Sequence, residues 1–183
     1  MKKKLRDIVL EKRDSLGKSE ISEMSNTIKE RLFLTDEFRK ARNILFYAPF
    51  KSEVGTHLMI KEALKSKNIS IPKLSGKNIE PSLISDFDNL IETGTFGILE
   101  SLELVKVNYK SISLVIVPGI VFDVEGHRIG SGLGYYDKFL KKIPKAFKIG
   151  LAFDFQVAER IPIEEHDVAV DMIVTEKRVI RIK

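Results

Sequence analysis

Apolar residues recur at helical spacing through the first 41 residues of the chain. In residues 2–16 they fall on one helical stripe with charged residues around it, and Gly17 is placed to end that helix. A second helix is expected to begin near Ser19, with apolar positions at Ile21, Met24, Ile28 and Leu32. A short helical turn is expected from Thr35 to Ala41. The pattern therefore predicts a helical N-terminal part.

Short apolar runs alternate with helical segments in the next part of the chain. Residues 43–48 and 69–74 are nearly continuous apolar runs, which are typical of buried strands. Between them, a helix is expected to begin at Thr56 and to carry its apolar side at Met59, Ile60, Ala63 and Leu64. A strand, a helix and a strand in this order predict a parallel pair with a right-handed crossover.

The second half of the chain continues this alternation. Strands are expected at residues 79–84, 113–117, 148–152, 172–175 and 178–182, and mostly loop and short turns between Asp86 and Gly97. A helix is expected at residues 135–142, where Pro144 ends it, and a short helical turn at residues 156–160. We therefore expect an α/β, three-layer Rossmann-like fold, with a mainly parallel central sheet and helices on both faces, and one domain over residues 1–183.

Composition narrows the classes of protein that the chain can represent. It has no cysteine, which excludes disulfides and cysteine metal sites, and it has no apolar run of about 18 residues that would span a membrane. The basic N-terminus lacks the continuous apolar segment of a signal peptide, so we expect a cytoplasmic protein. The net charge of +5 comes from basic and acidic residues spread along the chain, so an anionic small substrate explains the basic excess as well as nucleic acid does, and plain surface solubility accounts for most of the lysines.

The most informative stretch is residues 115–140, where a buried strand, a glycine-rich loop and a helix start follow one another. Glycines at alternate positions let backbone N–H groups approach a ligand closely, and a helix start favours an anion. Arg128 can add a charge-assisted bond to phosphate, and Asp137 can bind Mg²⁺. Neither the Walker nor the Rossmann glycine pattern fits. From these residues alone, a plain glycine-rich turn explains the pattern equally well.

The motifs of this stretch carry a family resemblance. Pro118-Gly119, Phe122-Asp123, Gly126 and the block from Arg128 to Asp137 (RIGSGLGYYD) resemble the motif of 5-formyltetrahydrofolate cyclo-ligases, also called 5,10-methenyltetrahydrofolate synthetases. Weaker matches follow the same order along the chain: residues 2–6 (KKKLR), 53–56 (EVGT), 150–153 (GLAF) with Gln156, and Pro162, His166-Asp167, Asp171 and Thr175-Glu176. The resemblance thus covers nearly the whole sequence.

This resemblance implies an activity and its co-substrates. Enzymes of this family use ATP and Mg²⁺ to convert 5-formyltetrahydrofolate into 5,10-methenyltetrahydrofolate, with release of ADP and phosphate. The γ-phosphoryl group would activate the formyl oxygen, and the N10 amine would then close the ring. The tasks left to the protein are positioning and charge stabilisation. The resemblance therefore implies an ATP-dependent ligase with a folate substrate.

The resemblance also assigns roles to individual residues. The nucleotide would be bound by two groups: Lys2, Lys3, Lys4, Leu5 and Arg6, and Arg128, Ile129, Gly130, Ser131, Gly132, Leu133, Gly134, Tyr135 and Tyr136. The folate would contact Phe50, Glu53, Gly132, Gly134 and Tyr135. The Mg²⁺ carboxylates would be Asp137 and Asp171, and Arg128 and Asp137 would be the catalytic residues.

Some interpretations stay open at the level of sequence. His127 and His166 are left without a catalytic role, because a lone histidine is more often structural and the chemistry needs little proton transfer. We expect a monomer that binds ATP and 5-formyltetrahydrofolate, with no nucleic-acid or membrane partner. Two alternatives are another small-molecule enzyme on the same α/β layout and a non-catalytic binder of nucleotide or nucleic acid, for which strongly salt-dependent binding would be diagnostic.

Overall fold

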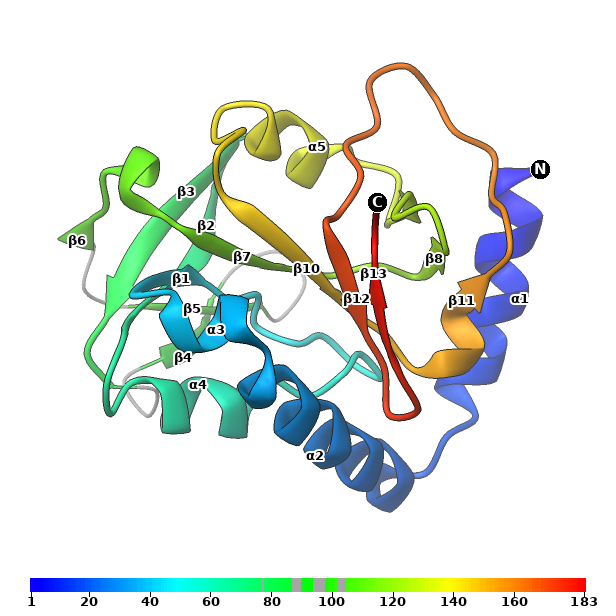
Figure 1. The fold of residues 1–183 in the computed structure, drawn as a ribbon, viewed down its shortest axis with the longest axis horizontal. Coiled ribbons are helices and arrows are strands. Elements are labelled where there is room, and N and C mark those ends of the chain that lie inside the picture. Colours follow the sequence, from blue (N-terminus) through cyan, green and yellow to red (C-terminus); the bar gives the residue numbers. More distant parts are fainter. Residues whose placement is uncertain (77, 87–89, 94–97, 102–104) are drawn as a thin grey trace.

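The fold is built around an eight-stranded sheet (Figure 1), seen in a computed structural model that describes residues 1–76, 78–86, 90–93, 98–101 and 105–183. Its five central strands are parallel and lie in the order β12, β10, β7, β1, β2. They span Met172–Val174, Phe147–Leu151, Leu114–Val117, Asn43–Leu45 and Asn68–Ser75. Antiparallel strands extend both edges: β13 (Val179–Arg181) beyond β12, and β3 (Asn78–Ile84) with β6 (Val105–Lys106) beyond β2.

Helices cover both faces of this sheet, which confirms the three-layer α/β prediction. Successive residues of β7 point to opposite faces and are all fully buried, as expected for a parallel strand packed on two sides. Leu114 and Ile116 share a core with α2 (Lys18–Leu34), α3 (Asp36–Lys40) and α4 (His57–Ala63). Val115 and Val117 pack on the other side with α5 (Tyr135–Leu140). The predicted crossover pair is present as β1, α4 and β2.

A second, three-stranded sheet positions the first helix (Figure 1). It consists of β11 (Val157–Ala158), β8 (Val121–Asp123) and β9 (Arg128–Ile129). The helix α1 (Lys2–Asp14) packs its apolar side against this sheet through Leu5, Val9 and Leu10. Because the glycine-rich loop begins directly after β9, the same small sheet supports both α1 and that loop. The sequence did not predict this sheet.

Two other segments differ from the sequence expectation. Part of the loop expected between Asp86 and Gly97 forms an antiparallel pair of β4 (Leu90–Thr93) and β5 (Ile98–Ser101), while Asp88 and Gly97 lie outside the described residues. The helical turn expected at residues 156–160 is instead a 3₁₀ turn, η2 (Asp154–Gln156), followed by β11. A further 3₁₀ turn, η1 (Tyr109–Ser111), leads into β7. The sequence did not predict β11, because a strand of two residues is too short to show an alternation of apolar and polar side chains.

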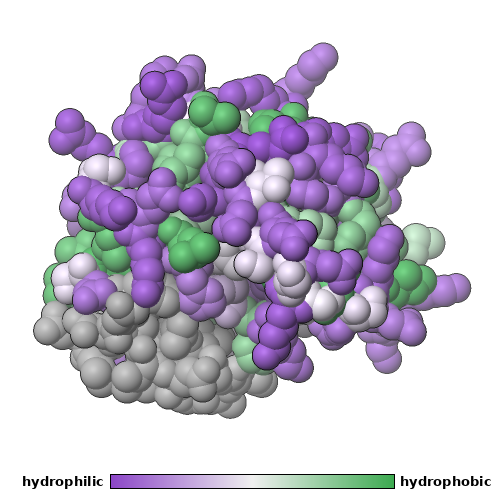
Figure 2. Space-filling model, turned by 90° about the horizontal axis from the view of Figure 1, so that it is seen from below, coloured by the Kyte–Doolittle hydropathy of each residue, from purple (hydrophilic) through white to green (hydrophobic). Residues whose placement is uncertain are grey.

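The surface seen from the side of α2 and α4 is mostly hydrophilic, with isolated hydrophobic residues outside the grey atoms (Figure 2). Leu34 at the end of α2 and Leu58 in α4 are among the exposed apolar side chains. Single exposed apolar residues are ordinary for a folded protein. No helix in the described parts of the chain is both long and apolar enough to cross a bilayer.

Candidate active site

A cavity of about 820 Å³ lies at the carboxyl edge of the parallel sheet. Tyr47 and Ala48, which follow β1, and Pro118 and Gly119, which follow β7, form part of its wall. This edge is where open α/β sheets commonly bind ligands, because successive loops diverge there. Other segments of the wall are α1, the residues around Phe50, the ends of β2 and β3, the glycine-rich loop and part of the segment 164–167. The fold thus gathers segments from both ends of the chain around one space.

The glycine-rich loop forms an exposed side of the cavity, as the sequence predicted for a ligand-binding loop. Gly132 and Gly134 have φ angles of +97° and +66°, which L side chains rarely adopt. Gly130 lies in ordinary backbone geometry, and its carbonyl oxygen accepts a hydrogen bond of 2.9 Å from Arg6 Nε. The following helix, α5, has only six residues. The dipole of so short a helix is weak, so an anion at this place would depend mainly on N–H groups of the loop.

The first helix brings basic residues to the cavity, but not every residue that was expected there. Lys2, Lys3 and Arg6 line the cavity. Lys4 is exposed and is not part of the lining, and Leu5 packs against the cluster that holds α1 to the small sheet. The nucleotide contacts predicted for these two side chains are therefore not supported by their positions. On a helix only one face can point at a given neighbour.

Lys2 is fixed by two carboxylates at the rim of the cavity. Its Nζ lies 2.9 Å from Asp167 Oδ2 and 3.0 Å from Glu164 Oε1. Desolvation alone would lower the pKa of Lys2, but the hydrogen bonds with Asp167 and Glu164 outweigh it and raise that pKa. Glu164 and Asp167 both line the cavity, and the sequence analysis did not assign either to the site. The pairing joins the first residues of the chain to a loop near its end.

Arg128 and Asp137 form a buried ion pair in the cavity wall. Arg128 Nη2 lies 3.0 Å from Asp137 Oδ1, and Arg128 Nη1 donates a 2.8 Å hydrogen bond to the carbonyl oxygen of Val168. Val168 N in turn donates to Asp137 Oδ1 at 3.1 Å. Desolvation lowers the pKa of Arg128, and the neighbouring carboxylate of Asp137 opposes that shift. Arg128 is therefore a positioning group for Asp137 and the loop at Val168.

The donor atoms at Asp137 fit a hard divalent cation. Its Oδ1 is occupied by Arg128 and Val168, while Oδ2 has no hydrogen-bond partner among the described residues. A carboxylate oxygen without a partner is the type of ligand that Mg²⁺ takes, and phosphate oxygens and water commonly complete its octahedron. The sequence prediction for Asp137 is compatible with its position.

The metal role predicted for Asp171 does not fit its position in the structure. Asp171 Oδ2 accepts hydrogen bonds from Lys148 N at 2.7 Å and Lys148 Nζ at 3.1 Å, and Asp171 is not part of the cavity wall. The physical reason is strand direction. Asp171 precedes β12 and Lys148 lies at the start of β10, so both sit at the amino edge of the parallel strands, opposite to the cavity.

Glu53 and Phe50, which the resemblance assigns to the folate, both line the cavity. Glu53 Oε2 accepts a 2.9 Å hydrogen bond from Phe50 N. Desolvation raises the pKa of Glu53, against the opposing effects of that hydrogen bond and of Arg13. Tyr136, which was assigned to the nucleotide, also lines the cavity, and its buried hydroxyl oxygen has no partner among the residues that the structure describes. Tyr135 lies beside it in the lining.

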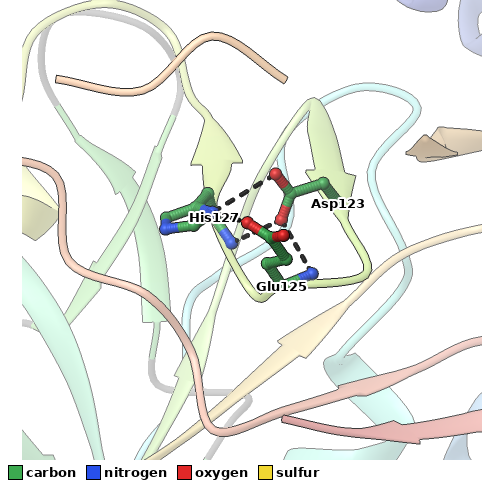
Figure 3. A group of neighbouring side chains, drawn as sticks. All are labelled: Asp123, Glu125 and His127. Carbon is green, nitrogen blue, oxygen red and sulfur yellow. Dashed lines mark hydrogen bonds and ion pairs between the residues drawn. The ribbon is translucent and has the colours of Figure 1, made fainter. Parts of the chain in front are cut away.

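The two histidines with open roles have different surroundings. His127 is bonded to Asp123 (Figure 3), which is fully buried and accepts from the backbone of Glu125 and His127 at 3.1 and 2.9 Å and from Ile161 N at 3.3 Å. His127 is therefore part of a bend held by Asp123, away from the cavity. His166 lines the cavity rim, with Nε2 3.3 Å from Glu164 Oε2.

Sequence comparisons relate the chain to known proteins. A sequence model described as the 5-formyltetrahydrofolate cyclo-ligase family matches residues 1–176. A 5-formyltetrahydrofolate cyclo-ligase from Mycoplasma genitalium is 30% identical, over 94% of this chain and 96% of its own length. A mouse 5-formyltetrahydrofolate cyclo-ligase is 24% identical, over 96% of this chain and 93% of its own length.

Solved structures with the same names share the fold. The NMR structure of the Aquifex aeolicus 5,10-methenyltetrahydrofolate synthetase superposes with a TM-score of 0.90 at 39% identity, covering 100% of this chain and 93% of that one. The structure of a 5,10-methenyltetrahydrofolate synthetase from Mycoplasma pneumoniae gives a TM-score of 0.78 at 26% identity, covering 96% of this chain and 98% of that one.

Proposed function

Because this chain belongs to the 5-formyltetrahydrofolate cyclo-ligase family and is an enzyme of that kind, we propose that it uses ATP and Mg²⁺ to convert 5-formyltetrahydrofolate into 5,10-methenyltetrahydrofolate. The family membership agrees with the resemblance noted in the sequence. The observation that supports the finer proposal is the convergence of the glycine-rich loop, the cations of α1 and Glu53 on one cavity. A nucleotide and a folate bound there would be adjacent, as phosphoryl transfer between them requires.

The proposed chemistry has two steps. In the first, the bond between the β,γ-bridging oxygen and the γ-phosphorus breaks, and a bond forms between that phosphorus and the formyl oxygen, so that ADP leaves. In the second, the N10 lone pair attacks the activated formyl carbon, the carbon–oxygen bond breaks, and phosphate leaves while N10 loses its proton to solvent. A formamide oxygen is a poor leaving group, and its phosphorylation removes that barrier.

The contributions of the chain are binding and orientation. The backbone N–H groups of the glycine-rich loop would bind phosphate oxygens, with Lys2, Lys3 and Arg6 supplying positive charge from α1. Arg128 would hold Asp137 in place through the 3.0 Å ion pair. Asp137 Oδ2 would hold the Mg²⁺, which neutralises charge on the phosphates. Glu53 would accept hydrogen bonds from the N–H donors of the pterin ring.

The substrates proposed here also define the expected partners. We propose that the protein acts as a cytoplasmic monomer on two small anionic molecules, ATP and a glutamate-tailed folate. The basic groups that line the cavity suit such ligands, because positive charge raises the local concentration of anions.

A spectroscopic assay tests the proposed function. Purified protein with ATP, Mg²⁺ and 5-formyltetrahydrofolate is expected to generate the absorbance of the methenyl product together with one ADP and one phosphate per turnover. Omitting ATP, or chelating Mg²⁺ before ATP is added, is expected to stop the reaction. No product in the complete mixture would refute the function, and product formed without ATP would refute the phosphorylation step.

A further inference from the structure

A buried arginine lies on the Glu53 side of the cavity and has no role in the function proposed above. Arg13, in the last turn of α1, is 5% exposed and lines the cavity. Its Nε donates a 3.1 Å hydrogen bond to Ser52 Oγ, and the Ser52 hydroxyl is also bonded to Asp14. This contact fixes the position of the guanidinium group beside the residue that precedes Glu53.

The rest of the guanidinium group is not used within the protein. Neither Nη nitrogen of Arg13 has a hydrogen-bond or ion-pair partner in the described part of the chain. In that part of the chain, the Tyr136 hydroxyl oxygen is the one fully buried side-chain polar atom without a partner. The Nη nitrogens of Arg13, which also lack partners, are therefore not fully buried. Because Arg13 lines the cavity, its small remaining exposure is to that space. The two Nη nitrogens together offer up to four N–H donors without partners, which can bind acceptor atoms of a ligand in the cavity.

The neighbouring carboxylate limits what that ligand can be. Arg13 attracts the Glu53 carboxylate without forming an ion pair, and Glu53 Oε1 has no hydrogen-bond partner among the described residues. The wall therefore presents hydrogen-bond donors and an acceptor next to each other. A carboxylate of the folate tail would meet repulsion from Glu53 and Asp14 at this place. A neutral group with adjacent acceptor and donor atoms suits both side chains at once.

We propose that Arg13 donates from its Nη groups to the ring carbonyl of the pterin, while Glu53 accepts from the ring N–H next to that carbonyl. The inference rests on the proposed function and adds the residue that recognises the edge of the ring that carries the carbonyl. The lactam edge of a pterin carries C=O, N–H and an amino group in a row, which complements one cationic donor followed by one carboxylate. Arg13 is thus a specificity-determining residue for the folate, and the nucleotide does not contact it.

Direct binding measurements test this role. Calorimetry with 5-formyltetrahydrofolate and no ATP is expected to give a dissociation constant about 10- to 100-fold higher for Arg13→Gln, as for loss of a hydrogen bond to a charged group. ATP affinity is expected to stay within about twofold of the native value. Lys12→Gln removes the same charge from the neighbouring, exposed position outside the cavity and is expected to change neither affinity. Equal losses for both ligands with Arg13→Gln would overturn the inference.

Ligand variants identify the atom that Arg13 contacts. The native protein is expected to prefer 5-formyltetrahydrofolate over its 4-amino counterpart, which lacks the ring carbonyl, and Arg13→Gln is expected to reduce that preference by about tenfold. The loss of affinity is expected to persist with 5-formyltetrahydropteroate, which has no glutamate tail. An unchanged preference, or an effect that vanishes with the tail-less ligand, would overturn the contact with the carbonyl.

A conservative variant and the activity assay separate this inference from its premises. If Arg13→Gln does not fold, Arg13→Lys keeps the charge in the same pocket and is expected to show a smaller loss of the same ligand preference. With saturating folate, kcat is expected to stay within about threefold while the KM for folate rises. Native protein that makes no methenyl product would refute the proposed function itself. Active native protein with an unchanged ligand preference in both variants would refute only the role of Arg13.

Discussion

Replacing Tyr136 by phenylalanine is expected to stabilise the ligand-free protein, whereas the same change at Tyr47 is expected to destabilise it. Both tyrosines line the cavity and have buried hydroxyl groups. Tyr47 donates a 3.0 Å hydrogen bond to the carbonyl oxygen of the buried residue Val54. The Tyr136 hydroxyl has no partner among the described residues. The two variants thus delete the same atom from a satisfied and from an unsatisfied position.

The expected magnitudes follow from the cost of an unpaired polar group. Burial, with a smaller contribution from Glu53 and against the effect of Arg128, raises the pKa of Tyr136, so the hydroxyl stays protonated at neutral pH. An unpaired buried hydroxyl costs about 1–3 kcal/mol, so Tyr136→Phe is expected to gain about 1 kcal/mol. Tyr47→Phe leaves the Val54 oxygen unpaired and is expected to lose about 1–2 kcal/mol. For a chain of this length these changes correspond to about 2–4 °C per kcal/mol in Tm.

Thermal and urea unfolding of the ligand-free variants measure this difference. The two Tm values are expected to move in opposite directions from that of the native protein, with unchanged urea m-values. A loss of stability in Tyr136→Phe as large as that in Tyr47→Phe would refute the reasoning, because it would mean that the Tyr136 hydroxyl is paired in the free protein.

Two further predictions concern the glycine-rich loop and the metal site. Gly132→Ala places a side chain at φ +97°, with its Cβ 3.4 Å from Arg6 Nη2, and this strain of about 1–3 kcal/mol is expected to raise the KM for ATP. Gly130→Ala, in open space and ordinary geometry, is the control for loop stability, and equal unfolding curves for the two variants would contradict the strain argument. Asp137→Asn, which keeps an oxygen for Arg128 but loses the charge, is expected to raise the Mg²⁺ concentration for half-maximal activity about tenfold or more. Asp171→Asn is expected to leave the Mg²⁺ titration unchanged and to cost less than about 1 kcal/mol, since its pair with Lys148 is partly exposed; a shifted titration would return Asp171 to the metal site.

The sequence predicted the layered fold because apolar runs mark its buried strands and apolar residues at helical spacing mark its helices. The buried runs at β7 and β10 and the crossover from β1 to β2 were predicted nearly at their observed bounds. The small sheet of β11, β8 and β9 was missed, because its strands of two or three residues lie in stretches that were interpreted as a bend, a loop and a helical turn and are not marked by a longer apolar run. Because this sheet was not predicted, the surface against which α1 packs was unknown, and the position of α1 could not be predicted either.

The residues that line the cavity were predicted where a motif is continuous and missed where contacts join distant parts of the sequence. The block from Arg128 to Asp137 could be interpreted directly, since loop and helix start are local features. Glu164 and Asp167 line the cavity and contact Lys2, and no local pattern records a contact between residues so far apart in the sequence. Asp171 was predicted to bind the metal because the sequence does not show at which edge of the sheet the turn before β12 lies.

Some motif glycines serve packing rather than ligand binding. A Cβ at Gly119 or at Gly150 would lie 2.5 Å from the ring of Phe122, so the two glycines make room for that fully buried side chain. Gly119 lies in the loop after β7 and Gly150 in β10, and Phe122 lies in β8. These residues belong to three separate matches to the family motif, and the structure shows that they describe a single contact.

The helix α1 connects the walls of the cavity through one of its faces. Lys2, Arg6 and Arg13 are four and seven residues apart, which places them within about 40° of one another around a helix. Lys2 is held by Glu164 and Asp167 at the rim, Arg6 bonds to the glycine-rich loop, and Arg13 bonds to Ser52 beside Glu53. A shift of α1 would therefore move the proposed nucleotide and folate contacts together. This geometry would give the two proposed substrates a shared support, and it explains why a basic N-terminal helix, which is usually only a solvated surface element, lines the cavity.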